Sequence, residues 1–392
     1  MQEIIETYLE KYLPRKDIIH RLPVSLPISK VWPELQKARK DKSESLPLLS
    51  IDGKPFWWVL TKSISSQADE VISLARREIV FDRPEYEEAF REAVLDEAVY
   101  SSVIEGAFTT KKEAREFIHE GRSPNNKSEQ MVKNNYEALT YVLEHIDESI
   151  TEQTIFDIYA LVTKDTLEAD VPTNAYRSES VFVQSSRGEI VHTAPEAEKV
   201  SGMMASLLEF ITNNELSPLI KACIAHFYFV YVHPFIDGNG RTARALSFMM
   251  LLQAGYDFFR YFSISGVIAE ERAKYYKAIK DVEDDDFDMT YFIDYYTGML
   301  ARAVKAMEER LVDKVVMEQT LDKLKAAGMN SRVIEGAKWI LTSPNQSITI
   351  KAWQKKFGVV LETARQDLFK LEDAGIVHRK LVKRQYVFEV KK

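Results

Sequence analysis

The chain has 392 residues, of which 45% are hydrophobic, and its formal net charge is −8. This length can bury more than one hydrophobic core, so two or three domains are expected. The single cysteine excludes an intrachain disulfide, and the apolar stretches at about 222–235 and 245–259 are too short or too interrupted to span a bilayer. The N-terminus shows no basic region followed by an apolar run. These features predict a cytoplasmic protein without a membrane segment.

A helix is predicted from about Pro84 to Glu105, because proline suits the first turn of a helix and Gly106 favours its end. Ser101 and Glu105 lie four residues apart and therefore on one face of that helix. The helix dipole disfavours an anion at the C-terminal end. Glu105 therefore either has a cationic partner elsewhere in the fold or is a surface glutamate at a frayed end.

Residues 176–192 are predicted to form a β-hairpin. Two β-biased runs, at 175–184 and 189–195, flank a Ser/Arg/Gly turn at 185–188. His192 is expected to be a turn residue and not a catalytic one.

The helix predicted at 218–232 is apolar almost all round and should therefore be buried. It should end at His233, because Pro234 disfavours the α conformation at the residue before it. The run His-Pro-Phe-Ile-Asp-Gly-Asn-Gly-Arg-Thr-Ala-Arg at 233–244 then places a histidine, a carboxylate, two glycines and two arginines within one loop and the first turn of a helix. A site that transfers a phosphate-containing group needs these parts as base, metal ligand, anion cradle and charge clamps.

The two glycines of this run, Gly238 and Gly240, can take positive φ, which lets consecutive amides converge on an anion. The next helix is predicted from about 241 to 254, with Arg241 and Arg244 on one face of its first turn. Two cations oppose the helix dipole there, at a cost of about 0.3–1 kcal/mol each. Taken singly, these features also fit a structural histidine, a solvated arginine pair and an ordinary turn. Their joint spacing favours a phosphate site.

Residues 331–392 differ in charge from the rest of the chain. They hold 13 Lys and Arg against 6 Asp and Glu, a net charge of +7, which leaves −15 on the preceding residues. Helices are predicted at 332–342, 349–357 and 361–373, and strands at 376–382 and 384–390.

That order of elements resembles a winged helix, in which residues 361–384 would contact duplex DNA. The candidate base-reading and phosphate-contacting residues are Thr363, Arg365, Gln366, Arg379, Lys380, Lys383 and Arg384. The alternatives are a winged helix that binds a protein, or one that packs on the rest of the chain.

The run at 233–244 matches the signature of the Fic family, His-x-Phe-x-Asp/Glu-Gly-Asn-Gly-Arg-x-x-Arg, at every fixed position. The chain therefore resembles an enzyme that transfers AMP from ATP to a protein hydroxyl. The resemblance implies a mainly α fold, with a Fic-type helical core, a β-hairpin flap and a small C-terminal winged-helix (α+β) domain. The expected division is an N-terminal helical region at 1–84, the Fic core at 85–312 with an inhibitory helix at its start, a linker helix at 313–330 and the winged-helix domain at 331–392.

The resemblance also implies roles for the loop residues of the run. His233 would be the general base that takes the proton from a Ser, Thr or Tyr hydroxyl of the target protein. Asp237 would hold Mg²⁺, with Mn²⁺ as the alternative ion, against the phosphates of ATP. Phe235 would point into the core and anchor the loop.

The remaining residues of the run would bind phosphate. By resemblance, the amides of Gly238, Asn239 and Gly240, with the Asn239 side chain, would form the anion hole. Arg241 and Arg244 would clamp the β- and γ-phosphates. In the Doc-like kinases a lysine replaces the glycine that matches Gly240, so glycine here favours nucleotidyl transfer.

A second motif resembles the inhibitory sequence of Fic proteins, Ser/Thr-x-x-x-Glu-Gly/Asn, which here reads Ser101 to Gly106. By this resemblance Glu105 would pair with Arg244 and block productive placement of the γ-phosphate. Its alternative role is to orient a water molecule for the removal of AMP.

The hairpin at 176–192 would be the flap, which docks the target protein as an added strand, although an ordinary structural hairpin is the alternative. Tyr275 and Tyr276 would border the nucleobase pocket. Glu283 stands where some relatives have an asparagine that reaches adenine, so UTP or another nucleotide remains an alternative donor. An acidic loop in solvent is the other interpretation of Glu283.

The sequence thus predicts an autoinhibited protein adenylyltransferase that modifies a protein, with itself as one candidate target. The alternatives are an enzyme that removes AMP with the same site and a nucleotide-sensing regulator that binds DNA. Because family members often dimerise, a homodimer is also an expected partner.

Overall fold

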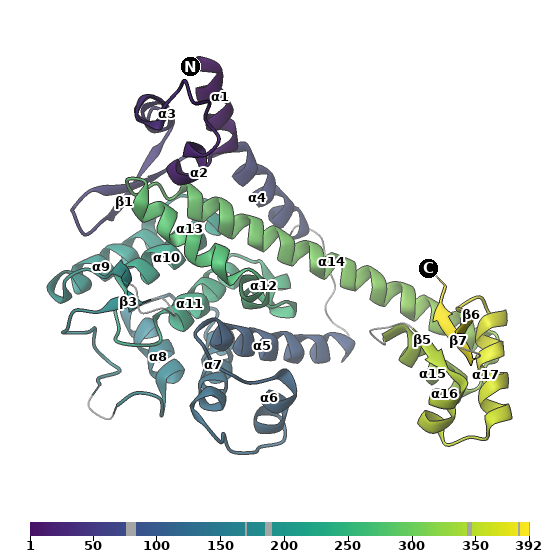
Figure 1. The fold of residues 1–392 in the computed structure, drawn as a ribbon. Coiled ribbons are helices and arrows are strands. Elements are labelled where there is room, and N and C mark those ends of the chain that lie inside the picture. Colours follow the sequence, from purple (N-terminus) through teal and green to yellow (C-terminus); the bar gives the residue numbers. More distant parts are fainter. Residues whose placement is uncertain (76–83, 169–170, 185–189, 343–346, 383–384, 392) are drawn as a thin grey trace. The chain divides into compact units, whose positions relative to one another are not determined.

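The computed structural model describes residues 1–392 except 76–83, 169–170, 185–189, 343–346, 383–384 and 392 (Figure 1). The chain divides into two compact units, residues 1–305 and 306–392. The boundary falls inside the long helix α14 (Thr290–Ala326). The structure does not divide the chain at residue 84, because residues on both sides of it belong to the first unit. Most of the expected linker helix at 313–330 is the C-terminal part of α14.

The first part of unit 1 is less helical than the sequence predicts. Its helices and strands are α1 (Gln2–Lys11), α2 (Arg15–Ile19), α3 (Ile28–Lys40), β1 (Glu44–Leu49), β2 (Pro55–Trp58) and α4 (Lys62–Ala75). Strands β1 and β2 pair antiparallel and form a hairpin. The Phe56 ring of this hairpin is buried and packs edge-on against Phe227, Tyr228 and Tyr231 of a later helix. The N-terminal region therefore supports the helix that leads into the candidate site.

The middle of unit 1 contains four helices, a hairpin and a further helix: α5 (Pro84–Ile104), α6 (Lys111–Ile118), α7 (Lys127–Glu144), α8 (Glu152–Thr163), β3 (Phe182–Gln184), β4 (Ile190–Thr193) and α9 (Ala197–Asn213). Strands β3 and β4 pair antiparallel with Val183 opposite His192. The hairpin expected within 176–192 is therefore present, while its expected turn lies outside the described residues.

The centre of unit 1 is the pair of helices α10 (Pro218–Val232) and α11 (Asn239–Gln253), which lie side by side (Figure 1). Helix α10 is buried on nearly all sides, as its apolar composition predicts. Helix α11 begins at Asn239, two residues earlier than expected, because Gly238 takes φ 78° and forms its N-cap. Gly240 therefore lies inside the first turn and has no positive φ.

The chain then continues through η1 (Asp257–Tyr261), α12 (Ile264–Glu270), α13 (Arg272–Asp284) and α14. The second unit contains α15 (Ser331–Thr342), β5 (Ser347–Thr349), α16 (Ile350–Phe357), α17 (Leu361–Asp373), β6 (Val377–Val382) and β7 (Gln385–Val390). Its sheet has the order β5-β7-β6 and packs around Trp353, Leu368 and Phe388. The three helices and two longer strands lie within a residue or two of their predicted positions, and β5 is an additional short strand.

The fold is mainly α-helical, as predicted from the sequence. Within the part of the chain that the structure describes, every helix is too short or too polar to be a membrane span.

Candidate active site

The loop after α10 begins with a strained residue. His233 takes φ 50° and ψ 59°, a left-handed conformation that is uncommon for residues other than glycine. Arg177, which is 5% exposed, holds the backbone there: its Nε donates to the His233 carbonyl oxygen at 2.8 Å, and its amide donates to the Pro234 carbonyl oxygen at 2.9 Å. Sequence analysis did not single out Arg177, because nothing in its local sequence signals a partner so far along the chain.

The same loop is fixed from inside by Phe235 and Asn239. The Phe235 ring is buried and stacks on Tyr159, with ring centroids 3.6 Å apart. The Asn239 side chain accepts from the Phe235 amide at 2.9 Å and donates to the Phe235 carbonyl oxygen at 2.8 Å. Both polar ends of the Asn239 side chain thus hold the loop, and its role in an anion hole stays a prediction.

The Asp237 carboxylate lies at the outer end of the loop, with 47% of its side chain exposed. One of its oxygens, Oδ1, accepts from the Gly238 amide at 2.6 Å. Among the described residues no group of three or more His, Cys, Asp or Glu is arranged to hold a metal ion. A single exposed carboxylate nevertheless fits Mg²⁺, which typically binds one or two carboxylates together with the phosphates of a substrate.

The His233 side chain is held in its neutral form. Its Nδ1 lies 3.3 Å from the Val230 carbonyl oxygen, which can only accept, so Nδ1 carries the proton and Nε2 has a free lone pair. Burial, followed by the charge of His192, lowers the pKa of His233 to about 4. The imidazole can therefore take up a proton at neutral pH.

Arg244 is the buried cation of the site, at 3% exposed. Its Nε donates to the Ser101 hydroxyl at 2.8 Å, and its Nη2 donates to the Ser101 carbonyl oxygen at 2.8 Å and to Glu105 Oε1 at 2.8 Å. Burial works against the guanidinium charge, but the Glu105 carboxylate outweighs it and raises the pKa of Arg244. The end of α5 and the start of α11 are thus joined through one guanidinium.

The Glu105 carboxylate also lies against the first turn of α11. A methyl group added at Gly240 would overlap Glu105 Oε1 and would contact Arg244 Nη1 at 3.2 Å. Glycine therefore leaves room here for the Glu105 carboxylate, and it does not take the positive φ that the sequence suggested. The start of a helix attracts anions. In this structure the anion at the start of α11 is a carboxylate of the chain itself.

Arg241 does not share that position. Its side chain is fully buried, its Nη1 donates to the Val162 carbonyl oxygen at 2.9 Å, and its Nη2 lies 3.5 Å from Asp237 Oδ1. The two arginines, expected on one face of the helix, therefore have different partners here: Arg244 contacts Glu105, whereas Arg241 contacts the Val162 carbonyl oxygen and lies near Asp237.

The two tyrosines of α13 also differ. Tyr275 is 2% exposed, and its hydroxyl lies 2.8 Å from Nε2 of His226 in the core. Burial lowers the pKa of His226 to about 3, so the ring is neutral and shares one hydrogen bond with the phenol. Tyr276 is 37% exposed, and its hydroxyl lies 3.5 Å from the Ile104 carbonyl oxygen, beside Glu105. Of the two expected nucleobase contacts, the structure presents only Tyr276 at the surface.

Two other expectations change. Glu283 is not in a loop but on α13, where its carboxylate lies 2.8 Å from Nδ1 of His192. His192 is a buried residue of strand β4 and not a turn residue.

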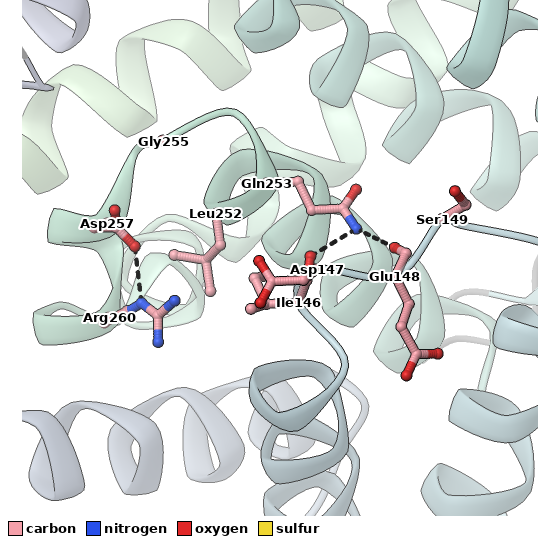
Figure 2. Close-up of a pocket in the computed structure, with 9 residues that line it drawn as sticks. All are labelled: Ile146, Asp147, Glu148, Ser149, Leu252, Gln253, Gly255, Asp257 and Arg260. Carbon is pink, nitrogen blue, oxygen red and sulfur yellow. Dashed lines mark hydrogen bonds and ion pairs between the residues drawn. The ribbon is translucent and has the colours of Figure 1, made fainter.

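A separate pocket of about 520 Å³ lies between the loop after α7 and the end of α11 (Figure 2). Gln253 spans part of it by donating to the carbonyl oxygens of Ile146 and Glu148, and Arg260 pairs with Asp257 at its other side. The residues that line it include none of the predicted site residues.

Comparison with known proteins places this site in a family. Residues 149–251, which include the loop and most of α11, match the model of the Fic/DOC family. This part of the chain is therefore similar to Fic/DOC family domains, as the run at 233–244 predicted.

Its relatives include proteins with a named activity. The chain is 31% identical over 206 residues to a protein adenylyltransferase Fic of Nematostella vectensis, a match that covers 49% of this chain and 44% of the relative. It is 27% identical over 207 residues to the protein of that name in Drosophila willistoni, covering 50% and 39%. The chain thus spans less than half the length of these curated relatives.

Solved structures share the fold. A Fic family protein from Desulfovibrio desulfuricans G20 superposes with a TM-score of 0.56 at 21% identity, covering 85% of this chain and 98% of that one. Fic-1 from C. elegans superposes with a TM-score of 0.50 at 21% identity, covering 63% and 71%.

Proposed function

We propose that this chain is an autoinhibited protein adenylyltransferase, which transfers AMP from ATP to a Ser, Thr or Tyr hydroxyl of a protein. The observation that carries the proposal is the pairing of a neutral, partly buried base with an anion site on one short loop: His233 at its start, and Arg244 with the first turn of α11 at its end. The names of the curated relatives support the same activity.

In the proposed reaction the acceptor hydroxyl oxygen attacks the α-phosphorus of ATP, and the bond from that phosphorus to the bridging oxygen breaks, releasing pyrophosphate. The hydroxyl proton passes to Nε2 of His233, which has the free lone pair. Arg244 and the amides at the start of α11 stabilise the phosphate charge. Asp237 would hold Mg²⁺, which supplies further neutralisation of the phosphates when it is bound.

The same contacts support autoinhibition. The Glu105 carboxylate occupies the start of α11 and binds Arg244, so an incoming phosphate must displace it. Ser101 orients the guanidinium toward Glu105 from the same helix. Removal of AMP by this site is the alternative direction, in which Glu105 would orient the attacking water.

The test is intact-mass spectrometry after incubation with ATP and Mg²⁺. Three chains are compared: the unmodified sequence, Glu105→Gly, and Glu105→Gly combined with His233→Ala. A mass increase of one AMP in Glu105→Gly alone is the expected result. Incubation with UTP tests the donor, and incubation of the adduct without nucleotide tests removal. No adduct in any of the three, together with nucleotide binding by all of them, would favour a nucleotide-sensing protein instead.

For the second unit we propose a winged-helix domain that contacts duplex DNA through residues 361–384, supported by its charge of +7 over 331–392. Two of the expected contact residues are already paired in the structure, Arg365 with Glu362 at 3.6 Å and Arg379 with Glu372 at 3.5 Å. Salt-dependent binding of the full chain to a duplex would support the proposal, and its absence at low salt would refute it.

A further inference from the structure

Two residues that the sequence left without a role meet beside the candidate active site. His192 of β4 is 9% exposed, and its two ring nitrogens face two different oxygen atoms. Its Nε2 lies 2.8 Å from the Tyr231 carbonyl oxygen of α10, and its Nδ1 lies 2.8 Å from Glu283 Oε1 of α13. The Glu283 contact is an ion pair that lacks the alignment of a hydrogen bond. One imidazole ring thus joins three elements of unit 1.

The chemistry of these contacts favours a positive charge on the ring. The carbonyl oxygen accepts a hydrogen bond, so Nε2 carries a proton. The carboxylate oxygen lies 2.8 Å from Nδ1 as an ion-pair contact, and its negative charge favours a proton on that nitrogen as well. Only the imidazolium carries a proton on both nitrogens. The Glu283 carboxylate, with 20% of its side chain exposed, supplies the compensating charge.

The position of this ring connects it to the proposed base. Tyr231, whose carbonyl oxygen it binds and whose ring it contacts at 5.3 Å between centroids, lies two residues before His233. The charged groups that act on His233 are His192 and Arg177, which disfavour its protonation, and Glu105, which favours it. Among these, His192 is the one that belongs to the hairpin.

We propose that His192, held as an imidazolium between the Tyr231 carbonyl oxygen and the Glu283 carboxylate, is a positioning residue for the transfer reaction. It fixes strand β4, and with it the edge on which a protein acceptor would dock, to the helix that carries His233. Its positive charge adds to the burial of His233, and both favour the neutral form of that ring, which can act as a base. This inference rests on the proposed function for its role in catalysis, but its structural content can be tested without any turnover.

The first experiment determines the protonation state of each histidine ring by NMR of the full chain, labelled with 15N at its seven histidines. At pH 7 the His192 ring should show two protonated nitrogens, and Glu283→Gln should convert it to a neutral ring. Asp284→Asn, which removes the adjacent carboxylate that pairs with Lys280 at 3.4 Å, is the matched control and should leave His192 charged. A neutral His192 in the unmodified chain would overturn the inference.

The second experiment titrates His233 in His192→Gln, which retains a donor for the Tyr231 carbonyl oxygen but not the charge. The pH at the midpoint of the His233 titration should rise by about 0.5 or more, because the nearby positive charge of His192 has been removed. An unchanged midpoint, with the hairpin amides as protected from hydrogen exchange as before, would refute the electrostatic role.

The third experiment combines His192→Gln and, separately, Asp284→Asn with Glu105→Gly, and it measures the rate of AMP transfer as a function of pH. A shift of the acidic limb with His192→Gln, absent in Asp284→Asn, supports the role in catalysis; equal profiles would overturn it. If Glu105→Gly itself forms no adduct, the proposed function fails, while the two NMR results still decide the charge and position of His192.

Discussion

The ion pair between Glu105 and Arg244 leads to a quantitative prediction for ATP binding. A phosphate that enters the start of α11 must first break the 2.8 Å contact between Glu105 Oε1 and Arg244 Nη2. A hydrogen bond to a charged group contributes about 1.5–3 kcal/mol. Since about 1.4 kcal/mol corresponds to a factor of ten in affinity, Glu105→Ala should lower the dissociation constant for ATP by about 10- to 150-fold.

Isothermal titration calorimetry with ATP and Mg²⁺ measures this change directly. Both proteins should carry His233→Ala, so that ATP is not consumed during the titration. The matched control is Glu92→Ala on the same helix, because Glu92 pairs with Arg115 at 3.1 Å on the surface, away from Arg244. The dissociation constant of Glu92→Ala for ATP should stay within about twofold of that of the protein with His233→Ala alone, because an exposed ion pair contributes little. Equal ATP affinity in Glu105→Ala and Glu92→Ala would refute the view that Glu105 competes with phosphate.

Three further predictions concern the loop. Because the pKa of His233 is lowered to about 4, kcat/KM of the Glu105→Gly enzyme should stay level from pH 8 to 6 and fall only as the pH approaches 4. Half-maximal activity near pH 6.5 would contradict the lowered pKa. Gly240→Ala in the same background should weaken ATP binding by at least ~10-fold, because its methyl group would lie in the space that the Glu105 carboxylate fills in the unmodified chain and that a phosphate must enter. Unchanged affinity in calorimetry would contradict this. Asn239→Ala leaves the buried amide and carbonyl of Phe235 without partners and should lower the free energy of unfolding by about 1–3 kcal/mol for each group. An unchanged melting temperature would contradict this prediction.

Local sequence rules predicted the framework of the site well. A proline after His233 ended α10, the apolar character of 218–232 predicted its burial, and Gly238 does take positive φ. For Glu105, the poor fit of an anion to the end of α5 left a cationic partner and a surface position both open, and only the resemblance to the inhibitory sequence named Arg244, which it contacts in the structure. These are properties of single elements, so they can be deduced from spacing and helix chemistry.

The directions of individual side chains could not be deduced in this way. Arg241 and Arg244 lie on one helix, but one meets the Val162 carbonyl oxygen and the other meets Glu105, because both α8 and α5 contact that helix and offer different partners. Asn239 turned toward Phe235 for the same reason: its partner is fixed by the shape of the loop. The contacts of Arg177 join distant segments, and no local pattern reveals them.

The Glu105–Arg244 pair has a further consequence, because both partners lie in one compact unit of one chain. A separate inhibitor leaves its site on dilution, whereas a tethered carboxylate keeps the same effective concentration at Arg244 however dilute the protein becomes. The inhibited state should therefore be independent of how much of this protein is present. Relief has to come from an anion that outcompetes Glu105, or from a change that moves the end of α5 away from Arg244.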